Sequence, residues 1–379
     1  MITTHRNMLE DKVRCNSYKK AIMQIIKPGH TVVDIGTGSG LLSYFALMAG
    51  AKKVYAIDWG DIIEDSKKIA KCNNFLDRIE FIKNVSTNVV LPTKVDVIIS
   101  EILGSFAIEE DIVKFLNDAK KRFLKRKGII IPFCVEMKLA LIEAKQEYEN
   151  LIGFWNKNLY GIDYSEVLEE ALNYRYTSSN LSINDLISNS EKIHTIDFYK
   201  LDKEDISINK SVNFKIKRKG TIYGMAGWFK TYLTENVILS TFSKNKKTHW
   251  GVNFFPIKNP IKVEKGENIL VKISGQKVFN TTVWTWEIKN KNHIFKHSTF
   301  KNMKFNKEKI LQNSLDYIPL LDNEEKKVLE FIFNKCDGTK SIKQISEELY
   351  LKYPENFPTF DKAQNKVRNV ILSNNIKEI

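Results

Sequence analysis

The sequence predicts a protein that combines a doubly wound α/β domain over residues 1–132, a mainly β domain over residues 133–300 and a small helical domain over residues 301–379. Three observations predict this division. Short β-branched runs alternate with helical patterns before Pro132, as in a parallel sheet covered on both faces. Strand-like runs between Gly, Asn and Lys clusters follow, and helical patterns end the chain. The length of 379 residues also exceeds one ordinary domain of roughly 100–200 residues.

In the first domain, short apolar runs predict five parallel strands, at Thr31–Ile35, Lys53–Ile57, Ile79–Ile82, Val95–Ile99 and Gly128–Ile131. Helical patterns precede or separate them, at Asp11–Ile26, Leu41–Ala49, Asp61–Cys72 and Glu109–Lys125. Open α/β sheets bind ligands at the carboxyl ends of their strands, so we expect the functional residues at that edge.

The second domain begins with a strand at Phe133–Glu143, followed by helices at Lys145–Tyr160 and Ser165–Leu172. Further strands are expected at Ile193–Tyr199, Val212–Arg218, Ile222–Leu233, Val237–Phe242, His249–Phe255, Ile269–Ser274 and Thr282–Ile288. Helices at Asn323–Asn334, Ser341–Leu351 and Asp361–Ser373 form the third domain.

The composition excludes several classes of protein. Hydrophobic residues make up 43% of the chain and charged residues 27%, which is typical of a globular protein rather than a disordered one. No apolar run approaches the roughly 20 residues that cross a bilayer, and residues 1–10 lack the apolar core of a signal peptide. We therefore expect a soluble, cytoplasmic protein without a membrane partner.

The cysteines and the net charge are less informative. The four cysteines form no C-x-x-C pair, so neither a disulfide framework nor a metal site is predicted. The net charge of +14 is consistent with a nucleic-acid surface, but most lysines are dispersed among Asn and Ile residues. Solvated lysine-rich faces are the preferred interpretation, and a nucleic-acid partner is not expected.

A glycine-rich turn follows the first predicted strand, in the segment Asp34-Ile35-Gly36-Thr37-Gly38-Ser39-Gly40. Glycine permits positive φ and a close approach of the backbone to a ligand. Asp58 ends the next strand, where a carboxylate can accept hydrogen bonds from both hydroxyls of a ribose. This order of strand, turn, helix, strand and acid predicts a cofactor that contains a nucleoside.

The position of Asp34 separates the candidate cofactors. The turn lacks the G-x-x-x-x-G-K-[ST] spacing of a phosphate-binding loop. A carboxylate two residues before Gly36 suits the cationic end of S-adenosylmethionine better than a pyrophosphate. Methyl transfer is therefore favoured over dinucleotide redox chemistry.

Two glutamates follow the fourth predicted strand. Glu101 comes directly after Ser100 at the strand end, and Glu110 lies nine residues further along. Acidic residues at 109–111 are also expected at a helix N-terminus without any function. A carboxylate such as Glu101 at the mouth of a buried strand is costly unless it is paired, which indicates a functional site.

Together these segments resemble the protein arginine methyltransferase family over about residues 5–290. The resemblance rests on five ordered motifs: His5–Arg14 (H-x-x-M-L-x-D-x-x-R), Asp34–Gly40, Ser100–Glu110, Asn158–Ser165 and Thr248-His249-Trp250. It implies a Rossmann-like methyltransferase domain, a β-barrel domain that binds substrate and forms a homodimer, and S-adenosylmethionine as cofactor.

The resemblance also implies roles for individual residues. Arg14 is expected to bind the carboxylate of the cofactor. Gly36 and Gly38 are expected to contact the cofactor through their backbone, and Asp58 is expected to bind its ribose. Glu101 and Glu110 are expected to bind a guanidinium, with His249, paired to Asp11, as the proton acceptor or as a structural histidine. The candidate catalytic residues are Glu101, Glu110, His249 and Asp11, and the candidate cofactor-binding residues are Met8, Arg14, Asp34, Gly36, Gly38, Asp58, Ser86 and Thr87.

The chain departs from the family pattern at three places. The family's Y-F-x-x-Y helix does not precede His5, so we expect a short lid or one supplied otherwise. Ile102-Leu103-Gly104-Ser105 replaces the usual Trp-Met-Gly-Tyr of the hairpin, and Thr87 stands where a glutamate commonly meets the adenine. These departures concern the acceptor more than the cofactor.

The helices after residue 300 resemble the small winged-helix domain that binds the precursor peptide in pyrroloquinoline quinone biosynthesis. The resemblance implies a peptide or precursor-peptide partner, while a structural cap and a nucleic-acid-binding domain are the alternatives. We expect an N-methyltransferase acting on a peptide or protein, arginine preferred, in the maturation of a ribosomal peptide. Methylation of an amide, an amine or a hydroxyl, and a non-catalytic peptide-binding scaffold, are the alternative functions.

Overall fold

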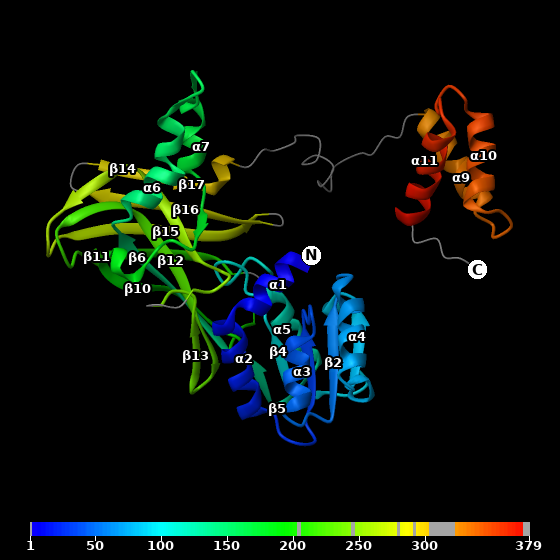
Figure 1. Cartoon of the computed structure of the whole chain (residues 1–379), viewed down its shortest axis with the longest axis horizontal. Coiled ribbons are helices and arrows are strands. Elements are labelled where there is room, and N and C mark those ends of the chain that lie inside the picture. Colours follow the sequence, from blue (N-terminus) through cyan, green and yellow to red (C-terminus); the bar gives the residue numbers. More distant parts are fainter. Residues whose placement is uncertain are drawn as a thin grey trace. The chain divides into compact units, whose positions relative to one another are not determined.

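The computed structural model describes residues 2–202, 206–243, 247–278, 281–290, 293–302 and 323–373. The chain divides into two compact units, Met1–Met303 and Lys304–Ile379 (Figure 1). The first unit contains a parallel sheet with its helices and a β-rich part, and the second is helical. Among the described residues, no helix combines the length and the apolar character needed to span a membrane.

A five-stranded parallel sheet forms the N-terminal half of the first unit, in the order β3-β2-β1-β4-β5. Its strands are β1 (Thr31–Ile35), β2 (Lys53–Asp58), β3 (Ile79–Lys83), β4 (Val95–Ser100) and β5 (Leu124–Ile131). Its helices are α1 (Ile2–Glu10), α2 (Lys12–Ile25), α3 (Leu41–Met48), α4 (Ile62–Cys72) and α5 (Ile112–Arg122). The doubly wound fold predicted from the alternating pattern is confirmed by the parallel pairing of all five strands.

Both faces of this sheet are buried, which explains why its strands are continuous apolar runs. On one face Val32 and Val97 pack in a cluster with Tyr18 of α2 and Leu42 of α3. On the other face a cluster that includes Leu116 of α5 continues into the β-rich part. The strand order reverses beside β1, so the carboxyl ends of β1 and β4 border the crevice in which ligands of such sheets bind.

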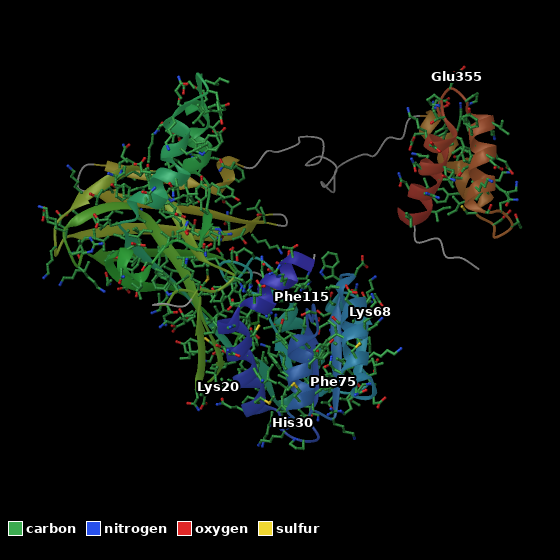
Figure 2. All side chains as sticks on the ribbon, viewed as in Figure 1. Lys20, His30, Lys68, Phe75, Phe115 and Glu355 are labelled. Atoms are coloured by element: carbon green, nitrogen blue, oxygen red, sulfur yellow. The ribbon has the colours of Figure 1, made fainter. Side chains whose placement is uncertain are left out.

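The two ends of the sheet are far apart. Figure 2 shows His30, which precedes β1, at one end of the domain and Phe115 of α5 at the other, near α1. The glycine turn and Glu101 follow β1 and β4 and so belong to the Phe115 end. Exposed Lys20 and Lys68 lie on the outer surfaces of α2 and α4, consistent with solvated lysines.

The hairpin between β4 and α5 differs from the sequence expectation. The helix expected from Glu109 begins only at Ile112, because Ala107 and Asp111 have left-handed backbones with φ of 71° and 58°. Residues other than glycine rarely adopt this backbone conformation, and it interrupts helical hydrogen bonding. Glu109 and Glu110 therefore lie in a loop and not on a helix.

The described strands of the β-rich part form two large open sheets and the small β7–β8 hairpin, so the expected closed β-barrel is wrong. One sheet has the order β10-β6-β12-β14-β9 with β13 paired to β12, and the other the order β11-β15-β16-β17. At one seam a single bridge joins Ser188 to Ile216. At the other, the Lys258 N–H donates to the imidazole Nε2 of His297 (3.3 Å), where a closed barrel would have backbone pairing. These contacts leave the edge strands without a continuous ladder.

The strands of these sheets are β6 (Cys134–Ile142), β9 (Tyr176–Ser178), β10 (Leu186–Asp197), β11 (Ile208–Lys215), β12 (Gly220–Thr234), β13 (Val237–Ser240), β14 (Val252–Val263), β15 (Asn268–Val278), β16 (Thr281–Asn290) and β17 (His293–Ser298). Between β6 and β9 lie helices α6 (Lys145–Leu151) and α7 (Leu168–Leu172) and the short strands β7 (Asn158–Leu159) and β8 (Ile162–Asp163). The helix expected over residues 145–160 ends at Leu151, and Tyr160 at the tip of the β7–β8 turn is 98% exposed.

The described residues of the second unit form three helices, α9 (Asn323–Lys335), α10 (Ile342–Lys352) and α11 (Phe360–Ser373). A capping box of Ser341 and Gln344 begins α10. Eight buried side chains form a core within this unit: Val328, Ile332, Ile345, Leu349, Phe357, Ala363, Val367 and Val370. Residues 323–373 contain no strand, so the wing of a winged helix is not among them. Of the rest of the expected third domain, residues 301 and 302 belong to the first unit, and residues 303–322 and 374–379 lie outside the described residues.

Candidate active site

A cavity of about 730 Å³ opens at the carboxyl end of the parallel sheet. Its wall includes residues of α1 and α2, the glycine turn, the ends of β2 and β4, and the loop before β14. Nine of the residues expected at the site line it: Met8, Arg14, Gly36, Gly38, Asp58, Ser86, Glu101, Glu110 and His249. Asp11, Asp34 and Thr87 are not on the wall.

Two of the glycines in the turn line the cavity, and both positions require glycine. Gly36 and Gly38 have φ of +72° and +53°, and a Cβ on Gly36 would lie 2.6 Å from Cγ2 of Ile102. A Cβ on Gly38 would lie 3.0 Å from the His5 ring. Since side chains at either position would enter space beside the cavity, the turn brings backbone instead of side chain to a ligand.

Asp34 stabilises this turn from the buried side. Its side chain is fully buried, and Oδ2 accepts hydrogen bonds from the hydroxyls of Thr37 (2.8 Å) and Ser43 (2.7 Å). Burial raises the pKa of Asp34 to about 6 although these hydrogen bonds act in the opposite direction. Its Oδ1 has no hydrogen-bond partner among the described residues. Asp34 therefore shapes the turn and leaves one acceptor oxygen available.

Asp58 ends β2 on the cavity wall. Oδ2 accepts from the backbone N–H of Gly38 and Oδ1 from that of Gly60, both at 2.8 Å. Each carboxylate oxygen retains a lone pair for a ligand hydroxyl. Ser86, also on the wall, has a buried Oγ without a described partner. Thr87, expected beside it, lies off the wall, so Ser86 is the better placed of the two.

Glu101 is paired with Arg14. The guanidinium Nε of Arg14 donates to Oε2 of Glu101 at 2.5 Å, and both side chains are buried. The negative charge of Glu101 outweighs burial and raises the pKa of Arg14. A buried charge that loses its partner is strongly destabilising, so this pair fixes α2 against the end of β4.

Glu110 differs from its neighbours in the hairpin. Its side chain is exposed at the cavity wall, and the wall excludes part of the surrounding water. This partial burial and the negative charges of Glu101 and Glu109 raise the pKa of Glu110 to about 7. Asp111, next in the sequence, pairs instead with Lys277 of β15.

Asp11 and His249 form the pair expected from the family resemblance. Oδ2 of Asp11 lies 2.9 Å from Nδ1 of His249 and also accepts from its backbone N–H at 2.9 Å. Oδ1 caps α2 by accepting from the N–H of Arg14. Burial opposes ionisation of Asp11, but these hydrogen bonds lower its pKa overall. Asp11 lies off the cavity wall and orients the imidazole of His249, and His249 lines the cavity.

Several wall residues were missing from the sequence prediction. His5 contacts the glycine turn, Trp59 follows Asp58 and is 77% exposed, and Phe115 of α5 completes the wall. The position of Trp59 directly after the expected ribose carboxylate was a usable signal. Nothing local indicated Arg175, which pairs with Glu109 across the hairpin at 3.3 Å between Nη2 and Oε1.

These residues fit S-adenosylmethionine. The glycine turn leaves room for a ligand against the backbone, and Asp58 can accept from ribose hydroxyls. The unpartnered Oγ of Ser86 is a buried polar atom on the cavity wall that a bound ligand can satisfy. No group of three or more His, Cys, Asp and Glu side chains in the described part of the chain could hold a metal ion.

Known proteins share both the sequence and the fold. Residues 135–318 match the arginine methyltransferase oligomerization subdomain, and residues 19–145 match the ribosomal protein L11 methyltransferase family. Protein arginine N-methyltransferase 1 of Dictyostelium discoideum is 33% identical over 271 residues, which are 70% of this chain and 79% of the relative. Its counterpart in Schizosaccharomyces pombe is 31% identical over 273 residues, with the same coverage.

Among solved structures, protein arginine methyltransferase 10 of Arabidopsis thaliana, in an open conformation, superposes with a TM-score of 0.68 and 26% identity. The match covers 79% of this chain and 98% of that one. The Trypanosoma brucei PRMT1 enzyme-prozyme complex with AdoHcy has a TM-score of 0.71 at 23% identity, over 78% of this chain and 96% of that one, and so shares the fold. The chain therefore belongs to the S-adenosylmethionine-dependent protein arginine N-methyltransferases.

Proposed function

We propose that this enzyme methylates the guanidinium of an arginine side chain in a protein or peptide, and the charges of the hairpin carry this proposal. Three of its carboxylates have ion-pair partners within the chain: Glu101 with Arg14, Glu109 with Arg175 and Asp111 with Lys277. Glu110 has no ion pair with any described residue and lies on the cavity wall. A cationic acceptor supplies the missing positive charge.

The cofactor-binding residues follow from the cavity wall. Gly36 and Gly38 would offer backbone to the cofactor, Asp58 would accept from its ribose, and Ser86 and Met8 line the same cavity. Arg14 remains the candidate for the cofactor carboxylate, since its guanidinium has five donors and Glu101 uses only Nε. When bound, S-adenosylmethionine supplies an electrophilic methyl group.

The hairpin carboxylates would orient the acceptor and stabilise its charge. A planar guanidinium forms charge-assisted hydrogen bonds with two carboxylates, which orients one nitrogen for attack. The pKa of a free guanidinium is above about 12, so it is not deprotonated before reaction and the proton leaves late. His249, held by Asp11, is the candidate acceptor or relay for that proton.

The alternatives make different demands on Glu110. An amide or hydroxyl acceptor brings no positive charge and leaves Glu110 without an ion pair among the described residues. A non-catalytic peptide-binding scaffold does not require the hairpin carboxylates or the Asp11–His249 pair. An amine acceptor carries charge but cannot use two carboxylates in one plane as a guanidinium does.

We further propose that the enzyme is a cytoplasmic homodimer and acts on a precursor peptide in ribosomal peptide maturation. Residues 135–318 match an oligomerization subdomain, and the exposed β7–β8 turn projects from the β-rich part of the first unit (Figure 1). Residues 323–373 would bind the leader segment of the peptide, because they form a separate helical unit with its own core. The acceptor residue and the peptide segment would thus be recognised by different units.

Binding of S-adenosylhomocysteine is expected to raise the melting temperature of the protein, whereas NAD is not. A ligand that binds only the folded state stabilises it by roughly 2.7 kcal/mol at a hundredfold excess over its Kd. Asp58→Ala is expected to reduce the shift, since each lost hydrogen bond contributes about 0.5–1.5 kcal/mol. Differential scanning fluorimetry of both variants with both ligands measures this. An equal response to NAD would contradict the cofactor assignment.

The rate of methyl transfer is expected to increase with pH through about 7. Glu110 binds a guanidinium only when ionised, and its pKa is raised from 4.5 to about 7. The folded enzyme therefore binds this proton more tightly than the unfolded chain, so Glu110 also makes stability decrease between pH 4.5 and 7. Measurement of kcat/KM from pH 5.5 to 9 tests the assignment. A profile that is flat down to pH 5.5 would show that Glu110 ionisation does not limit the reaction.

A further inference from the structure

Arg175 connects the carboxylate hairpin to the β-rich part of the same unit. It lies between α7 and β9, and its side chain is largely buried. Nη1 donates to the hydroxyl of Ser105 (2.9 Å) and to Oδ1 of Asn253, and Nη2 lies 3.3 Å from Oε1 of Glu109. One guanidinium therefore contacts two hairpin residues, Ser105 and Glu109, and one residue of β14.

The partners of Arg175 are themselves fixed. Asn253 is fully buried, and its Nδ2 donates to the carbonyls of Ser105 (2.8 Å) and Gly227 (3.2 Å). Oε2 of Glu109 accepts from the backbone N–H of Phe106 (2.7 Å) and that of Ile108 (3.3 Å). The Glu109 carboxylate thus holds the curve of the hairpin, and Arg175 holds Glu109.

Phe106 provides an apolar anchor beside this polar one. Its ring is fully buried between the two sheets, 5.0 Å from the ring centroid of Trp284 and 5.9 Å from that of Phe255. An apolar ring alone leaves rotation of the neighbouring peptides unrestricted. The hydrogen bond of Arg175 to Ser105 and its ion pair with Glu109 restrict that rotation.

We propose that Arg175 is a positioning residue for methyl transfer: it locks the hairpin onto β14 and neutralises Glu109, so that Glu110 alone faces the acceptor with an unpaired charge. Arg175 itself does not line the cavity. The inference rests on the proposed arginine methylation, because it concerns the geometry and charge of the same hairpin. It predicts that removal of Arg175 changes the acceptor side and not the cofactor side.

The charges around Glu110 determine the sign of the effect. Glu110 is influenced by Glu101 and Glu109 from the hairpin and by Arg14 from α2, and His249 and Asp111 line the same cavity. Without Arg175 the Glu109 charge is no longer balanced by a neighbouring cation. Activity is lost on the acidic side of the pH profile, which we call the acid limb. This limb then moves to higher pH.

The test compares Arg175→Met, Arg175→Lys, Glu109→Gln and the double variant Arg175→Met/Glu109→Gln. Arg218→Met is the matched control, since Arg218 forms another Arg–Glu pair, with Glu143, away from the cavity. For each protein we would measure kcat and KM for an arginine peptide, the pH profile, the Kd of S-adenosylhomocysteine and the melting temperature. A shift of about 1 Å at a reacting group can reduce rates about a hundredfold.

Arg175→Met is expected to lower kcat by about ten- to hundredfold and to move the acid limb to higher pH, with an unchanged Kd for S-adenosylhomocysteine. Arg175→Lys should restore the limb but only part of kcat, because a lysine cannot contact all three partners. The double variant should restore the limb and not kcat. If Arg175→Met fails to fold, Glu109→Gln decides, since loss of that negative charge should move the limb to lower pH.

Kinetics of Arg175→Met that match those of Arg218→Met would overturn the inference, as would an Arg175→Met enzyme whose only change is a lower melting temperature. An unmoved limb in Glu109→Gln would also overturn it. These outcomes all require an active wild-type enzyme. Absence of arginine methylation by the wild-type chain contradicts the proposed function instead, so the two failures are distinguishable.

Discussion

Glu110→Gln is expected to lower kcat for methylation of an arginine peptide by about 10²–10³-fold, the loss typical when one electrostatic contact to the transition state is removed. The amide keeps the shape of the carboxylate but carries no charge and only one acceptor oxygen. Glu110 is the hairpin carboxylate without an ion pair among the described residues, so its replacement disturbs no pair that holds the fold. The Kd for S-adenosylhomocysteine is expected to stay unchanged.

Glu101→Gln provides the comparison. This substitution also breaks the buried pair with Arg14, so we expect a similar loss of kcat together with a lower melting temperature. Glu80→Gln is the control, because Glu80 forms only an exposed pair with Lys53. Initial rates by mass spectrometry and thermal unfolding distinguish the three variants. Retained turnover in both hairpin variants would show that the acceptor is not a guanidinium.

The parallel sheet was predictable because its signals are local. Each strand is a short apolar run, and parallel pairing places the residues that follow β1, β2 and β4 at one edge. Asp34, Asp58 and Glu101 could therefore be assigned to one site from the sequence. The sequence pattern did not show that Asp34 lies beneath the glycine turn, away from the cavity wall, since hydrogen bonds to Thr37 and Ser43 decide this.

The remaining features depend on contacts that are distant in the sequence. Arg175 meets Ser105 from 70 residues away and Asn253 from 78 residues away, in a segment that resembles any strand preceded by a short helix. The two large sheets likewise stay open because no continuous ladder joins their edge strands. The contacts there are the isolated bridge between Ser188 and Ile216 and the hydrogen bond from the Lys258 N–H to the His297 side chain. Periodicity reveals which residues of a strand are buried but not whether its edge is paired.

A second large effect is expected from removal of the helical unit. If residues 323–373 bind a leader segment, as proposed, a chain that ends at Asn302 should methylate a leader-bearing peptide about 10²-fold more slowly at low peptide concentration, because a tethered leader raises the local concentration of the acceptor into the millimolar range. The helical unit buries its own core residues, all eight of them within 323–373, so the truncation removes that core as a whole. The parallel sheet and the carboxylate hairpin, which belong to the other unit, are retained.

The measurement uses a candidate precursor, a short peptide encoded beside the gene, with and without its proposed leader segment. Full-length and truncated enzymes should methylate the leaderless peptide at equal rates, since both contain Glu101, Glu110 and the Asp11–His249 pair. Only the full-length enzyme should gain from the leader, through a lower KM with kcat unchanged. If the helical unit is only a structural cap, its removal should lower the melting temperature and abolish both activities. Undiminished modification of the complete precursor by a stable truncated enzyme would exclude leader binding by residues 323–373.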